Sequence, residues 1–459
     1  MNVLAFDLGA SNGRCILGAF DGQRLNLEEI GRFDNAAVEL GHDIFWDILW
    51  IYNNIKRLTG ECVNKKIKIS SIGVNSWAQD YGLVGNGTLL TQVRSYRDPY
   101  TDGIFNTRHD LISPERLFRL NGTAPFKGAT LYQLAAAARQ NPGLFNGDII
   151  LQFIPNLISY FMTGVTSCDC TLASFSQIYN NTDNCWSGDI INTFGIPRIL
   201  PSADIPGRII GYTNQVFKEQ TGLKPVPVAL VAGHDTASAV YGAMDKNHAN
   251  TLYLSSGTWS MLAAHVDEPV TDHKTAGDEY YNAAGANGNR LLIRGVTGLW
   301  ILQECIKIWR RDGYEIDAHI LEKGFDNDIC GWFDADDPRL FHNYDMNAAV
   351  RELLNENGFS AGSNAAVYHA ILDSMARKYK HITEIYETII NKKFDKIKII
   401  GGGLKNKLLN DLTGKYTGKR IETGHPEASA VGNILLQLQA LGELDINDRP
   451  VIEGDGLYN

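Results

Sequence analysis

Residues 6–20 read FDLGASNGRCILGAF, an apolar run that stops at a turn of small residues and is followed by a second apolar run. This pattern predicts a strand, a turn and a second strand. Small residues in the turn let backbone N–H groups approach a phosphate. Asp7 stands at the strand end, where a carboxylate can hold Mg²⁺ directly or through water. The turn lacks the Lys-Ser/Thr ending of a P-loop, so it is not a Walker A motif.

The stretch YLSSGTWSMLAAH at 253–265 repeats the order of strand, small-residue turn and strand. Either turn alone is typical of a plain hairpin. Two such turns, each opening one half of the chain, indicate two similar lobes that bind one ligand. The polar segment YGAMDKNHAN at 241–250 is the expected boundary. We therefore expect one domain over 1–242, a second over 243–445, and a tail over 446–459.

Apolar periodicity away from these turns predicts a mixture of helices and strands. A helix is expected over 43–63, because Ile44, Ile48, Ile51 and Ile55 share one face. Further helices are expected at 130–140 and, buried, within 149–165. Loops and a β-rich edge are expected over 193–227, where Pro and Gly are frequent. Strands before and after these helices predict an α/β fold with mixed sheets.

Composition restricts the class of partner. The chain has 459 residues and a net charge of -10, which disfavours nucleic acid and anionic membranes as partners. The most apolar stretch, 149–165, carries Gln152, Pro155 and Asn156, so it is a poor membrane span. The seven cysteines are scattered without a CxxC pair, which is typical of a reducing cytoplasm. We expect a cytoplasmic protein without a leader peptide, as a monomer or homodimer.

The motif GHDTASAV at 233–240 follows an apolar strand and precedes a small-residue helix. Asp235 or Thr236 is expected at the helix N-cap, where an anion is favoured. We expect this position to keep the Asp235 carboxylate ionised at neutral pH. An ionised carboxylate near a hydroxyl can accept its proton as the hydroxyl attacks phosphorus. Asp235 is therefore the candidate general base.

Two other segments have the composition of ligand sites. Trp77 and Asp80 follow a strand, where ligands bind in open α/β sheets. Trp77 could cover a sugar face, and Asp80 could accept hydrogen bonds from neighbouring hydroxyls. Arg97 is a plausible companion on a loop. The glycines 401–403 after a buried strand would let a flat ligand such as adenine approach closely.

Taken together, these motifs resemble the FGGY family of carbohydrate kinases over about residues 1–445. DLGASNGR and LSSGTWS are similar to its two phosphate motifs, GHDTASAV to its catalytic motif, and IIGGGLKNKLLN to its adenine motif. The resemblance implies two actin-like ATPase (ribonuclease H-like) domains with ATP in the cleft between them. It also implies Mg²⁺ and transfer of the γ-phosphoryl group to a ketose hydroxyl. The likeness is greatest to members that convert L-rhamnulose to L-rhamnulose 1-phosphate.

The resemblance also implies roles for individual residues. The catalytic base matches Asp235, and Mg²⁺ would be held by Asp7 and Asp235. Contacts to the sugar match Ala78, His234, Asp235 and Thr236, and Trp77, Asp80 and Arg97 are added to them from the reasoning on the residues given above. Contacts to the nucleotide match Ala10, Ser11, Asn12, Gly13, Arg14, Thr258, Gly295, Gln303 and Gly402.

Two departures from the family pattern bear on the ligand. Ala78 stands where the L-rhamnulose branch has a glycine against the sugar, and Gly295 stands where it has an asparagine against the nucleotide. L-Fuculose and D-xylulose therefore remain alternative substrates. An actin-like ATPase without a sugar substrate is a further alternative, and a sugar-sensing regulator without catalysis is a remote one.

Overall fold

The computed structural model describes residues 1–245, 248–272, 280–314, 316, 321, 331–341, 345–360, 362–446 and 448–453. The chain forms two compact units. Unit 1 comprises Met1–Lys246, Val266–Leu292 and Ala428–Asn459, and unit 2 comprises Asn247–His265 and Ile293–Glu427. The end of the chain thus belongs to the same unit as its beginning. The expected boundary segment 241–250 and tail 446–459 lie partly outside the described residues.

A seven-stranded mixed sheet forms the centre of unit 1, in the order β13-β14-β6-β1-β2-β3-β21. Its strands are β13 (Arg208–Tyr212), β14 (Pro227–Leu230), β6 (Ser71–Ser76), β1 (Asn2–Leu8), β2 (Asn12–Phe20), β3 (Arg24–Asp34) and β21 (Val451–Glu453). β1 is parallel to β6, and β6 is parallel to β14. β1, β2 and β3 form an antiparallel meander.

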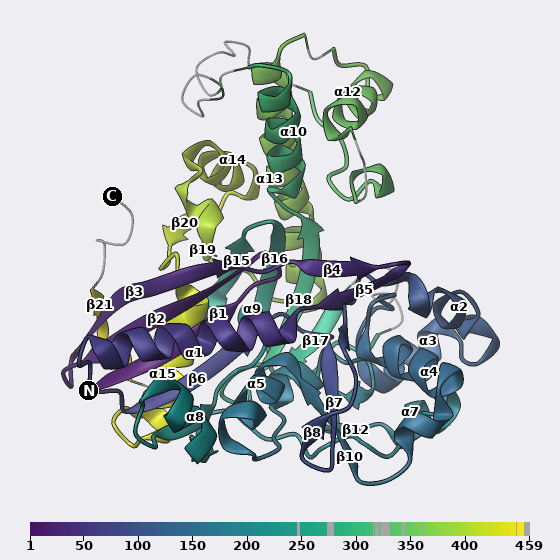
Figure 1. Ribbon diagram of the computed structural model, residues 1–459. Helices are drawn as coiled ribbons and strands as arrows, with labels where there is room; N and C mark the ends of the chain where they lie inside the picture. The colour runs from purple at the N-terminus through teal and green to yellow at the C-terminus, as the bar shows by residue number, and fades with distance from the viewer. Residues whose placement is uncertain are drawn as a thin grey trace. The chain divides into compact units, whose positions relative to one another are not determined.

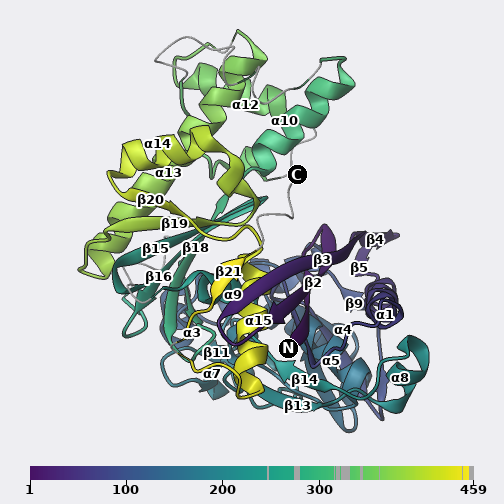
Figure 2. The ribbon, with the colours of Figure 1, turned by 90° about the vertical axis from the view of Figure 1, so that its left-hand side faces the viewer.

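Helices cover both faces of this sheet. One face packs against α1 (Ile48–Asn64), α5 (Ile154–Thr163) and α8 (Gln215–Thr221), and shares an apolar core with them that includes Leu4, Phe6 and Leu8. Because side chains alternate along a strand, Asp7 points to the opposite face. That face packs against α15 (Ala428–Ala440), which in turn contacts α9 (Asp235–Ala243). Figure 1 and Figure 2 show α1 and α15 on the two sides of the sheet.

Smaller elements complete unit 1. Two three-stranded sheets have the orders β10-β7-β8 and β4-β5-β9. Their strands are β10 (Ile149–Phe153), β7 (Tyr81–Gly85), β8 (Thr88–Leu89), β4 (Ala37–Leu40), β5 (Asp43–Trp46) and β9 (Val93–Arg94). The remaining elements are α2 (Asp102–Asn106), α3 (Pro114–Asn121), α4 (Thr130–Gln140), α6 (Cys170–Ala173), α7 (Gly188–Phe194), β11 (Tyr179–Asn180), β12 (Cys185–Trp186) and β17 (Tyr280–Ala284).

Unit 2 contains the strands β18-β16-β15-β19-β20 of a six-stranded mixed sheet whose remaining strand is β17. Its elements are β15 (Thr251–Ser256), β16 (Trp259–Val266), β18 (Arg290–Thr297), β19 (Lys396–Ile400), β20 (Arg420–Thr423), α10 (Trp300–Arg311), α12 (Met346–Glu356), α13 (Asn364–Ile389) and α14 (Lys407–Thr417). β15 forms a hairpin with β16 and runs parallel to β19. In unit 1, β1 likewise has a hairpin partner, β2, and a parallel neighbour, β6. The predicted α/β fold of two domains with mixed sheets and helices is confirmed.

Several local expectations were wrong for identifiable reasons. The helix expected from residue 43 begins at Ile48, because the Asp47 side chain caps it by accepting from the N–H of Trp50 at 2.9 Å. Ile44 lies in β5, paired with β4. The buried helix expected within 149–165 is α5, but it begins only at Ile154, after the strand β10, and has a proline in its first turn, where the missing N–H costs little. The region 193–227 also contains the helix α8.

Candidate active site

Three neighbouring parallel strands of unit 1 bring the predicted site residues to one edge of the sheet. In the register, Leu8 of β1 lies beside Ser76 of β6, and Ser76 forms a parallel bridge with His234 after β14. The turn after β1, the Trp77 segment and the GHD motif therefore follow the carboxyl ends of adjacent strands. This edge is where ligands bind in open α/β sheets.

The carboxylate of Asp7 is held by three side chains. Arg14 donates to Oδ2 through Nε at 2.9 Å and Nη2 at 2.6 Å, and Ser429 donates to the same oxygen at 2.6 Å. Asn75 donates to Oδ1 at 2.6 Å. Asp7 is buried. Its geometry is thus fixed from β2, β6 and α15, and a cation could reach it most directly through a water molecule.

Asp235 differs from expectation in two respects. The N-cap of α9 is His234, and Asp235 is the first helical residue. Its pKa is raised to about 7, chiefly by burial and then by the negative charge of Asp7, while hydrogen bonds from Thr236 and the charge of Arg14 act in the other direction. At neutral pH Asp235 is therefore only partly deprotonated, and less ionised than the helix N-terminus alone would make it. Although protein atoms surround the group on most sides, the side chain is 39% exposed, so a substrate can reach it.

His234 lies beside Asp235 as a neutral imidazole. Burial lowers its pKa to about 3, so it carries no charge at neutral pH. Its Nε2 is 3.5 Å from Oδ1 of Asp235, and its ring is 4.1 Å from the ring of Phe175. Its buried Nδ1 has no hydrogen-bond partner in the described part of the chain.

Asp80 holds two tryptophans in place. Its Oδ2 accepts from the indole N–H groups of Trp46 at 2.6 Å and Trp77 at 2.8 Å, and its Oδ1 accepts from Gln133 at 2.8 Å. The backbone N–H of Tyr96 also bonds to this carboxyl group, whose pKa burial raises to about 6. A carboxylate has about four acceptor positions. The expected contact between Asp80 and sugar hydroxyls therefore has no acceptor left to make it in this structure.

The other expected sugar contacts are divided between buried and exposed positions. Trp77 and Ala78 are buried at 7% and 8% exposure. Thr236 donates to Asp235 Oδ1 at 3.2 Å. Arg97 is exposed, and its Nε donates to the hydroxyl of Tyr96 at 3.2 Å. Tyr96 interacts electrostatically with both Asp80 and Asp235, so this aromatic side chain lies near the candidate base.

The first phosphate turn has open backbone donors. The turn is closed by a hydrogen bond from Gly9 N–H to Asn12 at 2.8 Å, while the N–H groups of Ala10 and Ser11 have no acceptor among the described residues. These two donors suit a phosphate. Gly13 has a different reason to be glycine, since a Cβ there would lie 2.2 Å from the ring of Phe33.

In unit 2, three glycine-containing segments meet at the second phosphate turn. A Cβ on Gly298 would lie 2.6 Å from the carbonyl oxygen of Gly257, and one on Gly403 would lie 2.0 Å from the hydroxyl of Ser256. The N–H of Trp300 donates to the carbonyl of Thr258 at 3.2 Å. Gly402 has open space beside it and is exposed, so a planar ligand can approach its backbone.

The two remaining nucleotide candidates lie in the same unit. Gly295 is on β18 next to the side chain of Met261, 3.3 Å from where its Cβ would be. Gln303 is exposed in the first turn of α10.

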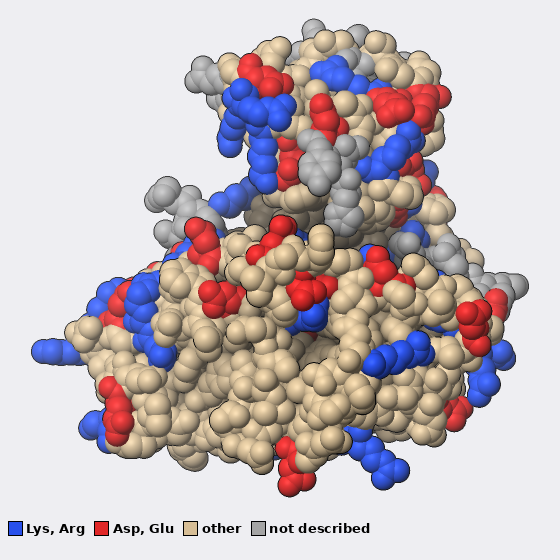
Figure 3. All heavy atoms as spheres, turned by 45° about the vertical axis from the view of Figure 1, so that its right-hand side comes forward, with Lys and Arg blue, Asp and Glu red and all other residues tan. Residues whose placement is uncertain are grey.

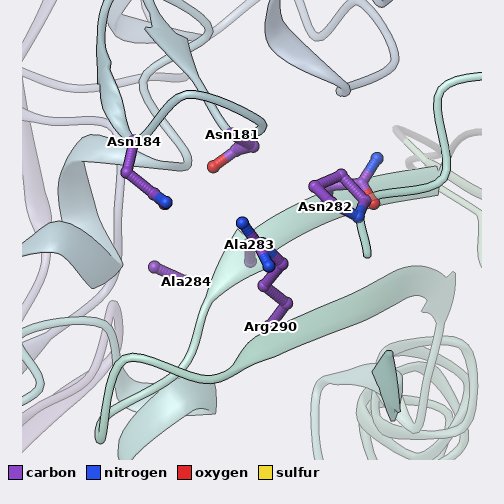
Figure 4. A pocket seen from close by; sticks show the side chains of 7 residues that line it. Asn181, Asn184, Asn282, Ala283, Ala284 and Arg290 are labelled. Carbon is purple, nitrogen blue, oxygen red and sulfur yellow. The ribbon is translucent and has the colours of Figure 1, made fainter. Parts of the chain in front are cut away.

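Two features lie apart from these residues. A pocket between the β11–β12 hairpin and β17 contains none of the predicted site residues, as Figure 4 shows; it is lined by Asn181, Asn184, Pro269, Asn282, Ala283, Ala284 and Arg290.

Acidic and basic side chains are interspersed on the face seen in Figure 3. In the described ranges, no three His, Cys, Asp or Glu side chains gather as metal ligands, and no helix has the length and apolarity to cross a bilayer.

Sequence reasoning missed several residues that shape the site. Trp46 and Gln133 bind Asp80, Ser429 binds Asp7, and Asp169 and Thr171 bind the GHD loop. Gln133 lies in the segment 130–140, for which we expected a helix and no site residue. The buried polar positions of α15 occur every fourth residue, and this periodicity was the one available signal for Ser429.

Comparisons with known proteins identify the family to which these arrangements belong. The chain belongs to the FGGY family of carbohydrate kinases: the N-terminal domain model matches residues 2–242 and the C-terminal domain model matches residues 252–441. The chain is 32% identical to a rhamnulokinase of Bacteroides thetaiotaomicron, over 96% of this chain and 91% of that protein. It is also 32% identical to a rhamnulokinase of Oceanobacillus iheyensis, over 96% and 94%.

Solved structures share the fold at lower identity. A ligand-bound xylulose kinase from Lactobacillus acidophilus aligns with a TM-score of 0.77 and 17% identity, over 97% of this chain and 91% of that chain. Plasmodium falciparum glycerol kinase with ADP aligns with a TM-score of 0.78 and 13% identity, over 99% and 94%. The chain therefore shares the fold of these proteins, and its membership of the family makes it a carbohydrate kinase.

Proposed function

We propose that this enzyme transfers the γ-phosphoryl group of ATP to the primary hydroxyl at C1 of L-rhamnulose, with Asp235 as the general base. The observation that carries the proposal is the convergence of Asp7, Trp77 and Asp235 at one edge of three parallel strands. The identity to two rhamnulokinases over nearly the whole chain supports the choice of sugar.

The proposed chemistry follows from the state of Asp235. Its pKa of about 7 leaves a large deprotonated fraction at neutral pH and makes the group a good proton acceptor. The sugar oxygen forms a bond to the γ-phosphorus as the bond from that phosphorus to the β-γ bridging oxygen breaks. The bridging oxygen leaves with the electron pair as ADP, and the hydroxyl proton passes to Asp235 Oδ.

Neutral His234 and its neighbours would orient the sugar. His234 precedes Asp235 in the chain, and its Nε2 lies 3.5 Å from Asp235 Oδ1. Thr236, Trp77, Ala78 and exposed Arg97 are proposed as the remaining sugar contacts. The extra methyl group of Ala78 narrows the site relative to glycine, so the rivals L-fuculose and D-xylulose are tested beside L-rhamnulose.

The residues present fit ATP and Mg²⁺. The free N–H groups of Ala10 and Ser11, with Asn12, Gly13 and Arg14, suit phosphate oxygens. Thr258, Gly295, Gln303 and Gly402 are proposed as nucleotide contacts of unit 2. Mg²⁺ would offset the phosphate charge, and Asp7 and Asp235, whose charges interact, are the carboxylates proposed to hold it. We also propose that ATP binds between the two domains. The proposed domain limits are 1–242 and 243–445.

The thiols agree with a reducing compartment, and we propose a cytoplasmic location. The described cysteines are all free, and burial raises the pKa of most of them, so they remain protonated thiols. Ketose and ATP are proposed as the small-molecule partners.

A coupled assay of ADP formation with a panel of ketoses tests this function. The panel contains L-rhamnulose, L-fuculose, D-xylulose and a no-sugar control, and ³¹P NMR identifies the phosphorylated carbon. We expect the largest kcat/KM with L-rhamnulose and a product phosphorylated at C1. A larger kcat/KM with another ketose would identify that ketose as the substrate in place of L-rhamnulose. A rate of ADP formation that no sugar changes would refute the sugar site.

A further inference from the structure

The loop that carries the candidate base is held from outside its own helix. α9 begins with His234 as N-cap, but the His234 side chain makes no capping hydrogen bond. The two backbone N–H groups just before Asp235 find their acceptors in another segment instead. Gly233 donates to Asp169 Oδ1 at 3.2 Å, and His234 donates to Thr171 Oγ1 at 3.1 Å.

Asp169 and Thr171 are themselves fixed. Both are completely buried, and the Thr171 hydroxyl donates to Asp169 Oδ1. Asp169 caps the short helix α6 through the N–H groups of Thr171 at 3.1 Å and Leu172 at 3.3 Å. The N–H of Cys170 donates to the carbonyl of Asp204 at 2.9 Å, which ties this segment to the chain before β13. We call Asp169 and Thr171 the clamp. These hydrogen bonds hold the clamp in place on the side that faces the loop 233–234.

Steric contacts act in the same place. A Cβ on Gly233 would lie 2.4 Å from Asp169 Oδ2 and 2.5 Å from the Leu172 side chain. Phe175, at the end of the same segment, packs against the His234 ring at 4.1 Å and stacks on Tyr281 at 5.5 Å. On the other side of the loop, the carbonyl of Gly233 accepts from the N–H of Ser76 at 2.8 Å. The two peptide groups before Asp235 are thus held from both sides.

We infer that Asp169 and Thr171 are positioning residues of the phosphoryl transfer: they set the peptide planes of Gly233 and His234, and thereby the direction of the Asp235 carboxylate. This inference rests on the proposed role of Asp235. Neither residue touches substrate. A displacement of the base by about 1 Å costs on the order of 10²-fold in rate. A substitution in the clamp is therefore expected to lower kcat.

Thr171→Val is the direct test, because it keeps the shape of the side chain and removes the hydroxyl. We expect kcat to fall by about 10- to 100-fold, with KM for ATP within about twofold of the wild type. Thr171→Ser restores the hydroxyl and is expected to restore kcat. Thr59→Val is the matched control, since Thr59 is equally buried and its hydroxyl bonds to Ile55 at 2.8 Å within α1, away from the site. If Thr171→Val does not fold, Thr171→Ala carries the same expectation.

Amide hydrogen exchange of peptides covering 233–236 gives a readout that needs no sugar. Exchange is expected to be faster in Thr171→Val than in the wild type, and unchanged in Thr171→Ser and Thr59→Val. Unchanged exchange in Thr171→Val would overturn the clamp. Faster exchange with wild-type kcat would overturn its role in positioning the base. Failure of every ketose in the activity assay would instead refute the proposed function and leave the exchange result standing.

Discussion

The hydroxyl of Ser429 donates to Oδ2 of Asp7 at 2.6 Å, although 422 residues separate the two in sequence. The contact begins a row along one face of α15. Asn433 donates to Asn75 at 2.7 Å, and Gln437 donates to the carbonyl of Leu4 at 3.0 Å. Residues four apart lie above one another on a helix. The row therefore aligns α15 with β1 and β6 directly behind the first phosphate turn.

Ser429→Ala is expected to reduce both stability and activity. It removes a buried hydrogen bond to a charged group, which lowers the free energy of unfolding by about 1.5–3 kcal/mol, and it loosens Asp7. Chemical denaturation and kcat measure the two effects. Ser374→Ala is the control, because that buried hydroxyl bonds to Ala370 at 2.7 Å in unit 2. Equal loss of kcat in both variants would contradict a specific effect through Asp7.

Asp235→Asn is expected to trade activity for stability. Loss of a general base lowers kcat by about 10²- to 10⁴-fold. The raised pKa means that the native state binds the Asp235 proton more tightly than the unfolded state, so wild-type stability falls as pH rises from the usual value of 3.8 toward about 7. The neutral amide avoids this loss. Thermal unfolding is expected to show a higher Tm for Asp235→Asn above neutral pH, with a smaller gain in acid; near-normal kcat would refute the base.

The pH dependence of kcat/KM is expected to follow the same group. Proton transfer to Asp235 requires its deprotonated form, so kcat/KM rises with pH through an apparent pKa of about 7. His234 adds no inflection near neutrality, because its pKa is lowered to about 3. Initial rates with both sugar and Mg·ATP subsaturating measure the profile, because they report the pKa of the free enzyme. A profile that is flat across neutral pH would contradict the raised pKa.

Gly13→Ala is expected to destabilise the fold through Phe33 rather than through the nucleotide. The new Cβ would overlap the Phe33 ring, and overpacking of this kind costs about 1–3 kcal/mol. Phe33→Leu removes the ring atoms that clash. The double variant is therefore expected to recover much of the unfolding free energy and the wild-type KM for ATP. Recovery of stability with a persistently high KM would show that Gly13 is needed by the phosphate itself.

Asp80→Asn distinguishes two roles for Asp80: a structural role in holding the tryptophans and a direct role in binding the sugar. The amide nitrogen would face donors, leaving a buried indole N–H or the Gln133 amide unpaired, at a cost of about 1–3 kcal/mol. We expect a lower unfolding free energy together with a higher KM for the sugar. Trp46→Phe, which removes one donor from a side chain only 1% exposed, is expected to act in the same direction. Lost sugar binding with unchanged stability would instead make Asp80 a direct sugar ligand.

The sequence indicated those features that depend on neighbours along the chain. The two hairpins, the helix at Thr130–Gln140 and the small-residue turns are local patterns, and the structure has them. The carboxyl ends of β1, β6 and β14 could also be expected to share an edge, because parallel strands do so.

Features that depend on distant residues were out of reach. The pKa of Asp235 depends on Asp7, and the state of Asp80 depends on Trp46 and Gln133. No local pattern in GHDTASAV shows that Asp169 and Thr171 cap its backbone. The helix at 43–63 was extended too far because Ile44 matches both a helical face and a strand, and only the pairing of β5 with β4 decides between them.

The membership of α15 in unit 1 has a consequence for synthesis on the ribosome. When Lys246 emerges, the nascent sheet still lacks the helix that covers one of its faces, and Asp7 and Asn75 lack two of their donors. The roughly 180 residues between Lys246 and Ala428 take about 10–40 s to translate at 5–20 residues per second. The first unit to be translated is thus the last to be finished, and a release of the chain before α15 leaves the face of the sheet that carries Asp7 uncovered.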